Sequence, residues 1–302
     1  MENTNLHKAK AAKNDEFYTQ LTDVAKELMH YKKHFKDKIV FCNCDDPTWS
    51  SFWKYFHLNF AELGLKKLIS THYDREEATY KMEYTGGDDN DIEVGVKTPL
   101  EGNGDFRNQE CLDLLDESDI VVTNPPFSLF REYVAVLMEH QKKFLIIGNK
   151  NAITYKEFFP LLKNNEVWIG CTNVKEFLQP DGSIKKFGNI GWFTNLDVAK
   201  RHEKLILWKN YTPEEYPRYD NYDAINVDKV SEIPCDYDGV MGVPITFMDK
   251  YNPLDFEIIG ADEAEGTGFS NGLYIQGSKY KQCYMNGKRI YKRIFIRKKV
   301  GT

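Results

Sequence analysis

Short apolar runs alternate with amphipathic segments along the first two thirds of the chain. Apolar runs of strand length occur at 38–44, 66–73, 119–124, 142–149 and 166–171. Apolar residues spaced three and four apart predict helices at 22–35, 49–63, 111–118, 128–140 and 154–165. Strands that alternate with helices in this way predict an α/β fold with a parallel sheet covered on both faces.

The pattern changes in the last third of the chain. Residues 211–240 are rich in Tyr, Asp and Pro and show little periodicity. Short strand-like runs separated by Gly and Asn follow at 242–249, 256–262, 272–278 and 289–299. We therefore predict that residues 1–210 form the sheet domain and that residues 211–302 form a smaller, β-rich part. Within the first part, the polar, glycine-rich stretch 85–104 predicts a loop or a hairpin.

Polar side chains lie at or near the ends of several predicted strands. They are Asp45, Asp74, Asp105 and Asn124. In open α/β sheets, ligands bind beyond the carboxyl ends of the strands. This coincidence predicts a ligand site at that edge of the sheet.

The segment Asn124-Pro125-Pro126-Phe127 ends one of these strands and precedes a helix. Two adjacent prolines lack backbone donors and fix two φ angles, so this tip is rigid and offers carbonyl groups. An aromatic amine is a poor nucleophile, and two acceptors on its N–H bonds favour a geometry in which its lone pair can attack. The Asn124 side chain and the Pro125 carbonyl can supply those acceptors, and Phe127 can stack on a flat base. The alternative is a proline-rich turn without chemistry.

Composition limits the class of protein. The 302 residues include 41% hydrophobic and 14% aromatic residues, which is enough for a sizeable core. No apolar run approaches the ~20 residues needed to cross a bilayer, and the N-terminus lacks the apolar segment of a signal peptide, so we expect a cytoplasmic protein. The six cysteines form no CxxC pair, so we expect no metal site. Cys42 and Cys44 are predicted to share one face of a strand as buried thiols.

The charge distribution is uneven although the net charge is −6. From residue 279 to the end the chain has no Asp or Glu and several basic residues, among them Lys288, Arg289, Lys292 and Arg293. Tyr and Phe residues are interleaved with them. A solvated basic tail and a phosphate-contacting hairpin explain this pattern equally well.

Several motifs together resemble a known family. VVTNPPFSLF resembles motif IV of S-adenosylmethionine-dependent amino-methyltransferases. Further segments are similar to the EcoRI-type DNA adenine-N6 methyltransferases: NDEFYTQ, VFCNCDDP, GNGDFR, KKFLIIGNKNAITYKE, WFTNLD, YDNYDAINV and GVMGVPITF. The resemblance covers most of residues 14–260. It implies a Rossmann-like S-adenosylmethionine-binding catalytic domain in 1–210 and a target-recognition, DNA-binding region in 211–302.

The resemblance also implies residues that hold the methionine end of the cofactor. DEFYTQ resembles motif X, which suggests Phe17, Tyr18 and Thr19. In the alternative, Thr22 caps a helix and Phe17 packs against it, and both interpretations can hold together.

The loop at the motif I position departs from the wider methyltransferase pattern. CNCDDP occupies this position without the expected Gly-x-Gly. Asn43, Cys44 and Asp45 are the residues that the resemblance places beside the cofactor.

For the nucleoside end of the cofactor, the resemblance implies three residues. Asp74 would hold the ribose hydroxyls, and its alternative is a solvated loop carboxylate. Asp105 would accept a hydrogen bond from the adenine amino group, and Phe106 would pack on the base. Asp105 could instead cap the helix that begins near Gln109.

The activity implied is methyl transfer from S-adenosylmethionine to N6 of an adenine flipped out of a duplex, and the resemblance suggests an AATT-centred site. It also favours a monomer, and a cognate restriction endonuclease could act on the same site. The alternatives are methylation of adenine-N6 or guanine-N2 in RNA, or of glutamine side chains. A non-enzymatic binding module would leave the strand-end carboxylates and NPPF unexplained.

Overall fold

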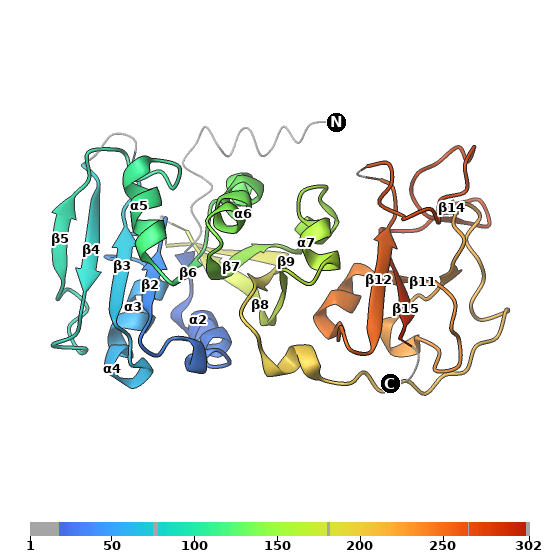
Figure 1. Cartoon of the computed structure of the whole chain (residues 1–302), viewed down its shortest axis with the longest axis horizontal. Coiled ribbons are helices and arrows are strands. Elements are labelled where there is room, and N and C mark those ends of the chain that lie inside the picture. The colour runs from blue at the N-terminus through green and yellow to red at the C-terminus, as the bar shows by residue number, and fades with distance from the viewer. Residues whose placement is uncertain (1–17, 75–77, 180–181, 265, 300–302) are drawn as a thin grey trace. The chain divides into compact units, whose positions relative to one another are not determined.

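The computed structural model describes residues 18–74, 78–179, 182–264 and 266–299 (Figure 1). The chain divides into two compact units. Unit 1 comprises Met1–Lys150 and Ile169–Asp197, and unit 2 comprises Asn151–Trp168 and Val198–Thr302. The predicted functional division at residue 210 stays a prediction.

Unit 1 is built on a mixed nine-stranded sheet in the order β1-β8-β9-β7-β6-β2-β3-β4-β5. Its strands are β1 (Tyr18–Thr19), β2 (Ile39–Cys42), β3 (Lys67–Thr71), β4 (Tyr80–Tyr84), β5 (Val96–Pro99), β6 (Ile120–Thr123), β7 (Lys143–Asn149), β8 (Trp168–Leu178) and β9 (Ile184–Thr194). Strands β7, β6, β2 and β3 run parallel. The α/β class is confirmed.

The predicted parallel sheet is found at this centre only, and the strands on both sides of it pair antiparallel. Strand β4 pairs antiparallel with β3, and β5 pairs antiparallel with β4. Strand β9 pairs antiparallel with β7. These flanking strands arise because the chain reverses through hairpins there, whereas a parallel pair needs a crossover connection.

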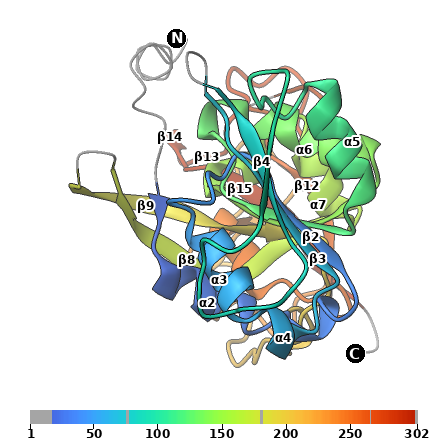
Figure 2. The ribbon, with the colours of Figure 1, turned by 90° about the vertical axis from the view of Figure 1, so that its left-hand side faces the viewer.

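Helices cover both faces of the sheet, as predicted. Figure 2 shows α2 (Leu21–Leu28), α3 (Ser51–Leu58) and α4 (Phe60–Leu63) on one face, and α5 (Gln109–Glu117) and α6 (Phe130–Glu139) on the other. The helix predicted at 49–63 is divided at Asn59, and the helix predicted at 22–35 ends at residue 28 and is followed by a short 3-10 turn at 32–34. Ser50 starts α3 by accepting hydrogen bonds from the backbone N–H groups of Phe52 and Trp53.

A buried carboxylate fastens α2 to β8. Glu27 is fully buried and accepts hydrogen bonds from the backbone N–H groups of Cys171 and Thr172, each at 2.7 Å. The hydroxyl of Tyr31 donates to the same carboxylate at 3.0 Å. A side chain at Gly170 would collide with Glu27, which explains the glycine in this strand. A buried carboxylate is stable only with such hydrogen-bond partners, so Glu27 holds β8 against α2.

Unit 2 contains the β-rich part. Its four-stranded sheet has the order β10-β11-β15-β12, and β13 and β14 form a separate pair. The strands are β10 (Ile225–Asn226), β11 (Met241–Pro244), β12 (Phe256–Ala261), β13 (Tyr284–Met285), β14 (Lys288–Arg289) and β15 (Arg293–Lys298). The helix predicted at 154–165 is the five-residue α7 (Phe159–Lys163). The prediction of a strand at 272–278 is wrong, because this segment forms only an isolated bridge between Tyr274 and Tyr222.

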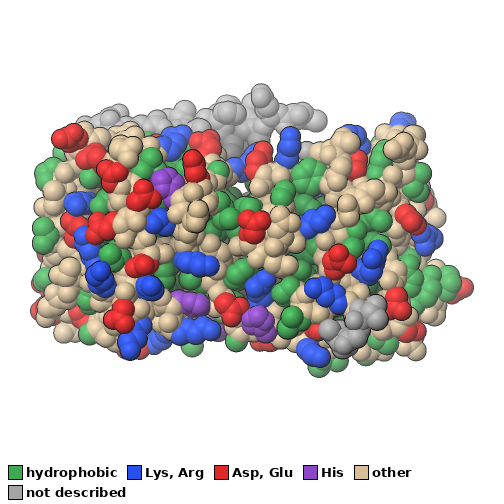
Figure 3. Space-filling model, in the orientation of Figure 1, with side chains coloured by type: hydrophobic (Ala, Val, Ile, Leu, Met, Phe, Trp, Pro, Cys, Tyr) green, Lys and Arg blue, Asp and Glu red, His purple; other side chains and the backbone are tan. Residues whose placement is uncertain are grey.

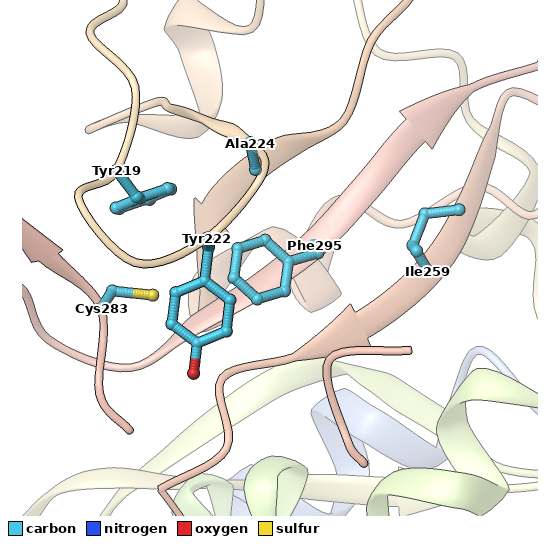
Figure 4. Packing of buried hydrophobic residues seen from close by; sticks show 6 residues of the cluster. All are labelled: Tyr219, Tyr222, Ala224, Ile259, Cys283 and Phe295. Carbon is cyan, nitrogen blue, oxygen red and sulfur yellow. The ribbon is translucent and has the colours of Figure 1, made fainter. Parts of the chain in front are cut away.

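Aromatic side chains form the core of unit 2. Tyr222 packs against Phe295 with ring centroids 4.9 Å apart (Figure 4). The cluster around them also contains Tyr219, Ala224, Ile259 and Cys283. The segment 219–224, which shows little sequence periodicity, therefore contributes core residues from a loop that precedes β10.

The surface carries charges of both signs and shows no membrane-spanning or metal-binding feature among the described residues. On the face drawn in Figure 3, Lys and Arg side chains are interspersed with Asp and Glu. Within the described residues, no helix is long and apolar enough to span a membrane. The same residues contain no group of three or more His, Cys, Asp and Glu side chains that could hold a metal ion.

Candidate active site

The Asn-Pro-Pro-Phe segment lies at the carboxyl end of β6, at the centre of the sheet. All residues of β6 are buried, and the strand ends at Thr123, directly before Asn124. The Oδ1 atom of Asn124 is buried. A 3-10 turn begins at Phe127 and leads into α6, and the Pro126 carbonyl accepts from the Leu129 N–H at 2.9 Å. The prolines thus convert a buried strand into a rigid strand–helix corner.

This corner is joined to the loop that follows the neighbouring strand β2. The hydroxyl of Thr123 makes hydrogen-bond contact with both the backbone carbonyl of Asn43 and the carboxylate of Asp45. The backbone N–H of Asn124 also donates to the Asp45 carboxylate. The motif I loop and the Asn-Pro-Pro-Phe corner are therefore one hydrogen-bonded unit.

The structure explains how this loop turns without glycine. Strand β2 ends at Cys42, and Cys44 adopts a left-handed conformation with φ of 64°. The Asn43 side-chain oxygen accepts from the Cys44 N–H at 2.9 Å and from the Thr71 hydroxyl at 3.0 Å. These hydrogen bonds stabilise a left-handed turn, a conformation in which glycine is usually found. The prediction that Cys42 and Cys44 share one face of a strand is wrong, because the turn rotates Cys44 away from the strand.

Asp45 has a perturbed acidity. The residue retains some exposed surface, but its carboxyl group is enclosed. Burial raises the pKa of Asp45 to about 7, and hydrogen bonds from Thr123, Ser50 and the Asn124 N–H oppose part of that rise. This carboxyl therefore titrates near neutral pH.

Asp105 lies in a glycine-containing turn before α5. Its carboxylate is 14% exposed and binds Arg107 through two hydrogen bonds, Nε to Oδ1 at 2.8 Å and Nη2 to Oδ2 at 2.7 Å. Arg107 also pairs with Glu132 at 2.9 Å. The alternative that Asp105 caps α5 is wrong, because the N-cap residue of that helix is Asn108. Gly104, with φ of +72°, is required since a side chain there would collide with the His72 carbonyl.

Phe106 packs inward beside this turn. It is 2% exposed, and its ring meets Tyr133 of α6 edge-on with centroids 4.9 Å apart. Tyr133 is 1% exposed, and its hydroxyl has no hydrogen-bond partner among the described residues. Burial raises the pKa of Tyr133, and the nearby Cys44 and Asp45 add to the rise. Sequence reasoning missed Tyr133, because only the packing of α6 on the sheet brings it to the motif I loop.

The remaining residues suggested for the cofactor lie at two further points. Asp74 is half-buried, three residues after β3, and its N–H donates to the Asn103 carbonyl at 3.2 Å. Thr19 in β1 is 4% exposed, and its hydroxyl has no hydrogen-bond partner within the described residues. Tyr18 is part of β1, whereas Phe17 lies outside the described residues.

Phe127 belongs to an aromatic cluster that the sequence did not predict. The centroid of its ring lies 6.0 Å from that of Phe177 and 6.1 Å from that of Phe187, and both pairs are arranged edge to face. Thr19 pairs with Phe177 across β1 and β8. The hairpin of β8 and β9 therefore connects the motif X strand to the Asn-Pro-Pro-Phe corner.

The four basic residues predicted to bind DNA have different environments in unit 2. Lys288 and Arg289 are exposed on β14. Lys292 donates to the Thr154 hydroxyl at 2.9 Å. Arg293 is 7% exposed and donates to the Tyr291 carbonyl at 3.1 Å and to the Asn226 side chain at 3.3 Å. Burial makes a phosphate contact by Arg293 unfavourable, so we retain Lys288 and Arg289 as the stronger candidates.

Comparison with known proteins places this geometry in a family. A family model described as "Adenine-specific methyltransferase EcoRI" matches residues 5–299. This chain belongs to the EcoRI family of adenine-specific methyltransferases. No solved structure shows a significant match to it.

Curated bacterial methyltransferases are similar to the chain over nearly its whole length. Type II methyltransferase M.EcoRI of Escherichia coli is 46% identical, over 97% of this chain and 96% of the relative. Type II methyltransferase M.MpnI of Mycoplasma pneumoniae is 38% identical, over 97% and 98%. The predicted family and the predicted enzyme class, an adenine-specific DNA methyltransferase, are confirmed.

The enclosed carboxyl of Asp45 predicts a pH-dependent stability. Because its folded pKa of about 7 exceeds the usual value near 4, the folded protein holds a proton that the unfolded chain has released between these pH values. The free energy of unfolding should therefore fall by roughly 2–4 kcal/mol from this group as pH rises from 4 through 7. Asp45→Asn should remove this fall, measured by urea denaturation across the pH range.

The control for Asp45→Asn is Asp91→Asn, which makes the same chemical substitution at an exposed position. If Asp45→Asn and wild type lose the same stability between pH 4 and 7, Asp45 is not the titrating group.

Proposed function

We propose that this methyltransferase transfers a methyl group from S-adenosylmethionine to the N6 amino group of an adenine extruded from duplex DNA. One observation carries the proposal. The Asn-Pro-Pro-Phe corner, which suits an aromatic amine, is hydrogen-bonded through Thr123 and Asp45 to the loop at the motif I position. The groups for substrate and cofactor thus meet at the end of two adjacent parallel strands, where such sheets bind ligands.

The residues of the corner have distinct roles in this proposal. The Asn124 side-chain oxygen and the Pro125 carbonyl accept hydrogen bonds from the two N6 hydrogens and leave the nitrogen lone pair directed at the methyl group. The cofactor supplies a methyl carbon that is already activated on a sulfonium. The N6 nitrogen would form the new bond to this carbon as the carbon–sulfur bond breaks and the sulfur leaves as a thioether, and the amine would then release one proton to water. Pro126 keeps the corner rigid, and Phe127 stacks on the extruded base.

Unit 1 offers polar groups that fit S-adenosylmethionine. The buried hydroxyls of Thr19 and Tyr133 have no hydrogen-bond partner among the described residues, so each is suited to a ligand atom. Thr19, with Phe17 and Tyr18, would hold the methionine end. Tyr133 would meet the part of the cofactor beside the motif I loop of Asn43, Cys44 and Asp45.

The nucleoside would lie beside the other strand-end residues. In this proposal Asp74 accepts from the ribose hydroxyls and Asp105 accepts from the adenine amino group. Asp105 Oδ1 already accepts from the backbone N–H and the Nε of Arg107, whereas Oδ2 accepts from Nη2, so the proposal assigns the adenine amino group to Oδ2. Arg107 would then orient the Asp105 carboxylate. Phe106 would act on the cofactor's adenine indirectly, by packing against Tyr133.

The finer features of the substrate are also proposals. The similarity to Type II methyltransferases supports a short duplex site, with an AATT-centred palindrome as the first sequence to test. We propose a monomer that modifies each strand separately, together with a cognate endonuclease acting on the same site. The domain proposal assigns cofactor binding to residues 1–210 and target recognition to 211–302.

Transfer of radiolabelled methyl groups tests the substrate class. Purified protein should label an AATT-containing duplex, with the label recovered as N6-methyladenine. Labelling of RNA or of protein in place of the duplex would overturn the proposal and favour the alternative substrates.

Substitutions at the corner test the chemistry. Because Asn124 acts on the amine during attack, Asn124→Ala should lower the single-turnover methylation rate by roughly 100-fold or more, with little change in DNA or cofactor affinity. Phe127→Ala should lower the rate less and destabilise the extruded base by about 1–3 kcal/mol, seen as weaker emission of a fluorescent adenine analogue at the target position. Near wild-type turnover of Asn124→Ala would disprove the mechanism.

A substitution at Asp105 tests the cofactor site. Asp105→Ala should weaken S-adenosylmethionine binding by roughly 10- to 100-fold in calorimetric titration, because it removes a charged hydrogen bond to the ligand. Glu132→Gln is the matched control, since it removes the other carboxylate partner of Arg107. If both variants weaken binding equally, Asp105 acts through Arg107 and does not contact the cofactor.

The exposed basic pair of β14 tests DNA binding by unit 2. If Lys288 and Arg289 bind phosphates, replacing both with Gln should weaken binding to all duplex sequences alike. The slope of log K against log salt should fall by about 0.9 for each phosphate that the variant no longer neutralises. An unchanged slope in the double variant would assign this hairpin to the solvated surface.

A further inference from the structure

The outer half of the β8–β9 hairpin projects past the strand beside it. Strand β7 pairs only with residues 190–194 of β9, so residues 184–189 extend beyond its end. We call residues 173–178 and 184–189 the hairpin arm. Figure 2 shows β8 and β9 running out from the rest of the sheet.

The two faces of the hairpin arm differ in character. Alternate residues of a strand share a face, so Lys175 lies on the face of Phe177 and Lys185 on the face of Phe187. The two Phe rings contact each other at 5.5 Å and both contact Phe127. The face with the two exposed lysines is therefore the face that meets the Asn-Pro-Pro-Phe corner.

The opposite face of the hairpin arm is electrically balanced. Glu176 is the sole carboxylate within the described residues 173–178 and 184–189, and it pairs with Lys186 at 3.0 Å. Both residues alternate with the lysines and phenylalanines of the first face, so they lie on the other one. The face that meets Phe127 thus carries two lysines and, among the described arm residues, no carboxylate of its own.

The two lysines stand close to the aromatic cluster. The Lys185 ammonium lies 5.3 Å from the centroid of the Phe187 ring. Lys175 is two residues from Phe177 along β8, and it has no ion pair among the described residues. Positive charge therefore lies beside the Phe187 ring, which itself contacts Phe127.

An extruded nucleotide brings its own phosphates with it. A base that reaches Asn124 and Phe127 carries a phosphate on each side of its sugar, and these charges need cations near the corner. Lysine ammonium groups supply such contacts without reading sequence. The face of the arm that meets Phe127 carries the positive charges of Lys175 and Lys185, which complement the negative phosphates.

We propose that the hairpin arm is a DNA-contacting element in unit 1, in which Lys175 and Lys185 bind the phosphates flanking the extruded adenine. This inference rests on the proposed function, because it takes duplex DNA as the substrate. It assigns the arm a positioning role: it holds the backbone of the flipped nucleotide, and Phe187 keeps the Phe127 ring in place. The arm does not contact the reacting atoms, which the Asn-Pro-Pro-Phe corner binds.

Single substitutions on the two faces test the proposal. Lys175→Gln, Lys185→Gln and Lys186→Gln each remove one positive charge from the same hairpin. Binding of the full-length protein to an adenine-containing duplex is measured by fluorescence anisotropy at several salt concentrations. The slope of log K against log salt should fall by about 0.9 for Lys175→Gln and for Lys185→Gln. It should stay at the wild-type value for Lys186→Gln, whose partner is Glu176.

The outcomes separate the two proposals. If wild type labels the duplex and the slope falls only for Lys175→Gln and Lys185→Gln, the arm binds phosphate. Unchanged slopes, or equal falls for all three variants, would overturn the arm proposal and leave the methyltransferase proposal standing. If wild type transfers no methyl group to duplex DNA, the proposed function fails and the arm proposal fails with it. Thermal melting of each variant verifies that the fold is retained.

Discussion

The organisation of unit 1 depends on the hydrogen bonds that join the ends of β2 and β6. The Thr123 hydroxyl lies within hydrogen-bond distance of both the Asp45 carboxylate and the Asn43 carbonyl, and the Asn124 N–H donates to Asp45 as well. The two strands are parallel neighbours, so their following loops leave the sheet at the same edge. The link fixes the distance between the groups proposed for the methyl donor and those proposed for the amine, which a transfer reaction requires.

Rigidity at this edge comes from groups that restrict the backbone in different ways. Pro125 and Pro126 fix φ angles, whereas Asn43 holds the left-handed turn at Cys44 through its side chain. The Asp45 carboxyl is enclosed and titrates near neutral pH, so it is held at an energetic cost. Such strained or desolvated groups are common at functional sites, where the surrounding fold stabilises them.

Basic residues take different roles according to their surroundings. Arg293 is buried in unit 2 and donates to the Asn226 side chain and the Tyr291 carbonyl, whereas Lys288 and Arg289 are exposed on a two-residue strand. In unit 1 the lysines of the hairpin arm divide by face, and Lys186 is paired with the carboxylate of the arm. Net charge alone therefore says little about where this protein would bind a polyanion.

Local pattern determined the parts of this protein whose structure depends on neighbours in the chain. Strands such as 39–42 and 120–123, the helices between them and the Asn124–Phe127 corner follow from hydrophobic periodicity and proline chemistry. The motifs also identified the family. Only the tertiary structure decided the antiparallel flanks of the sheet, the proximity of Tyr133 to the motif I loop, the cluster of Phe127, Phe177 and Phe187 and the burial of Arg293. These features join residues far apart in sequence, and their energies come from packing and desolvation that no local window contains.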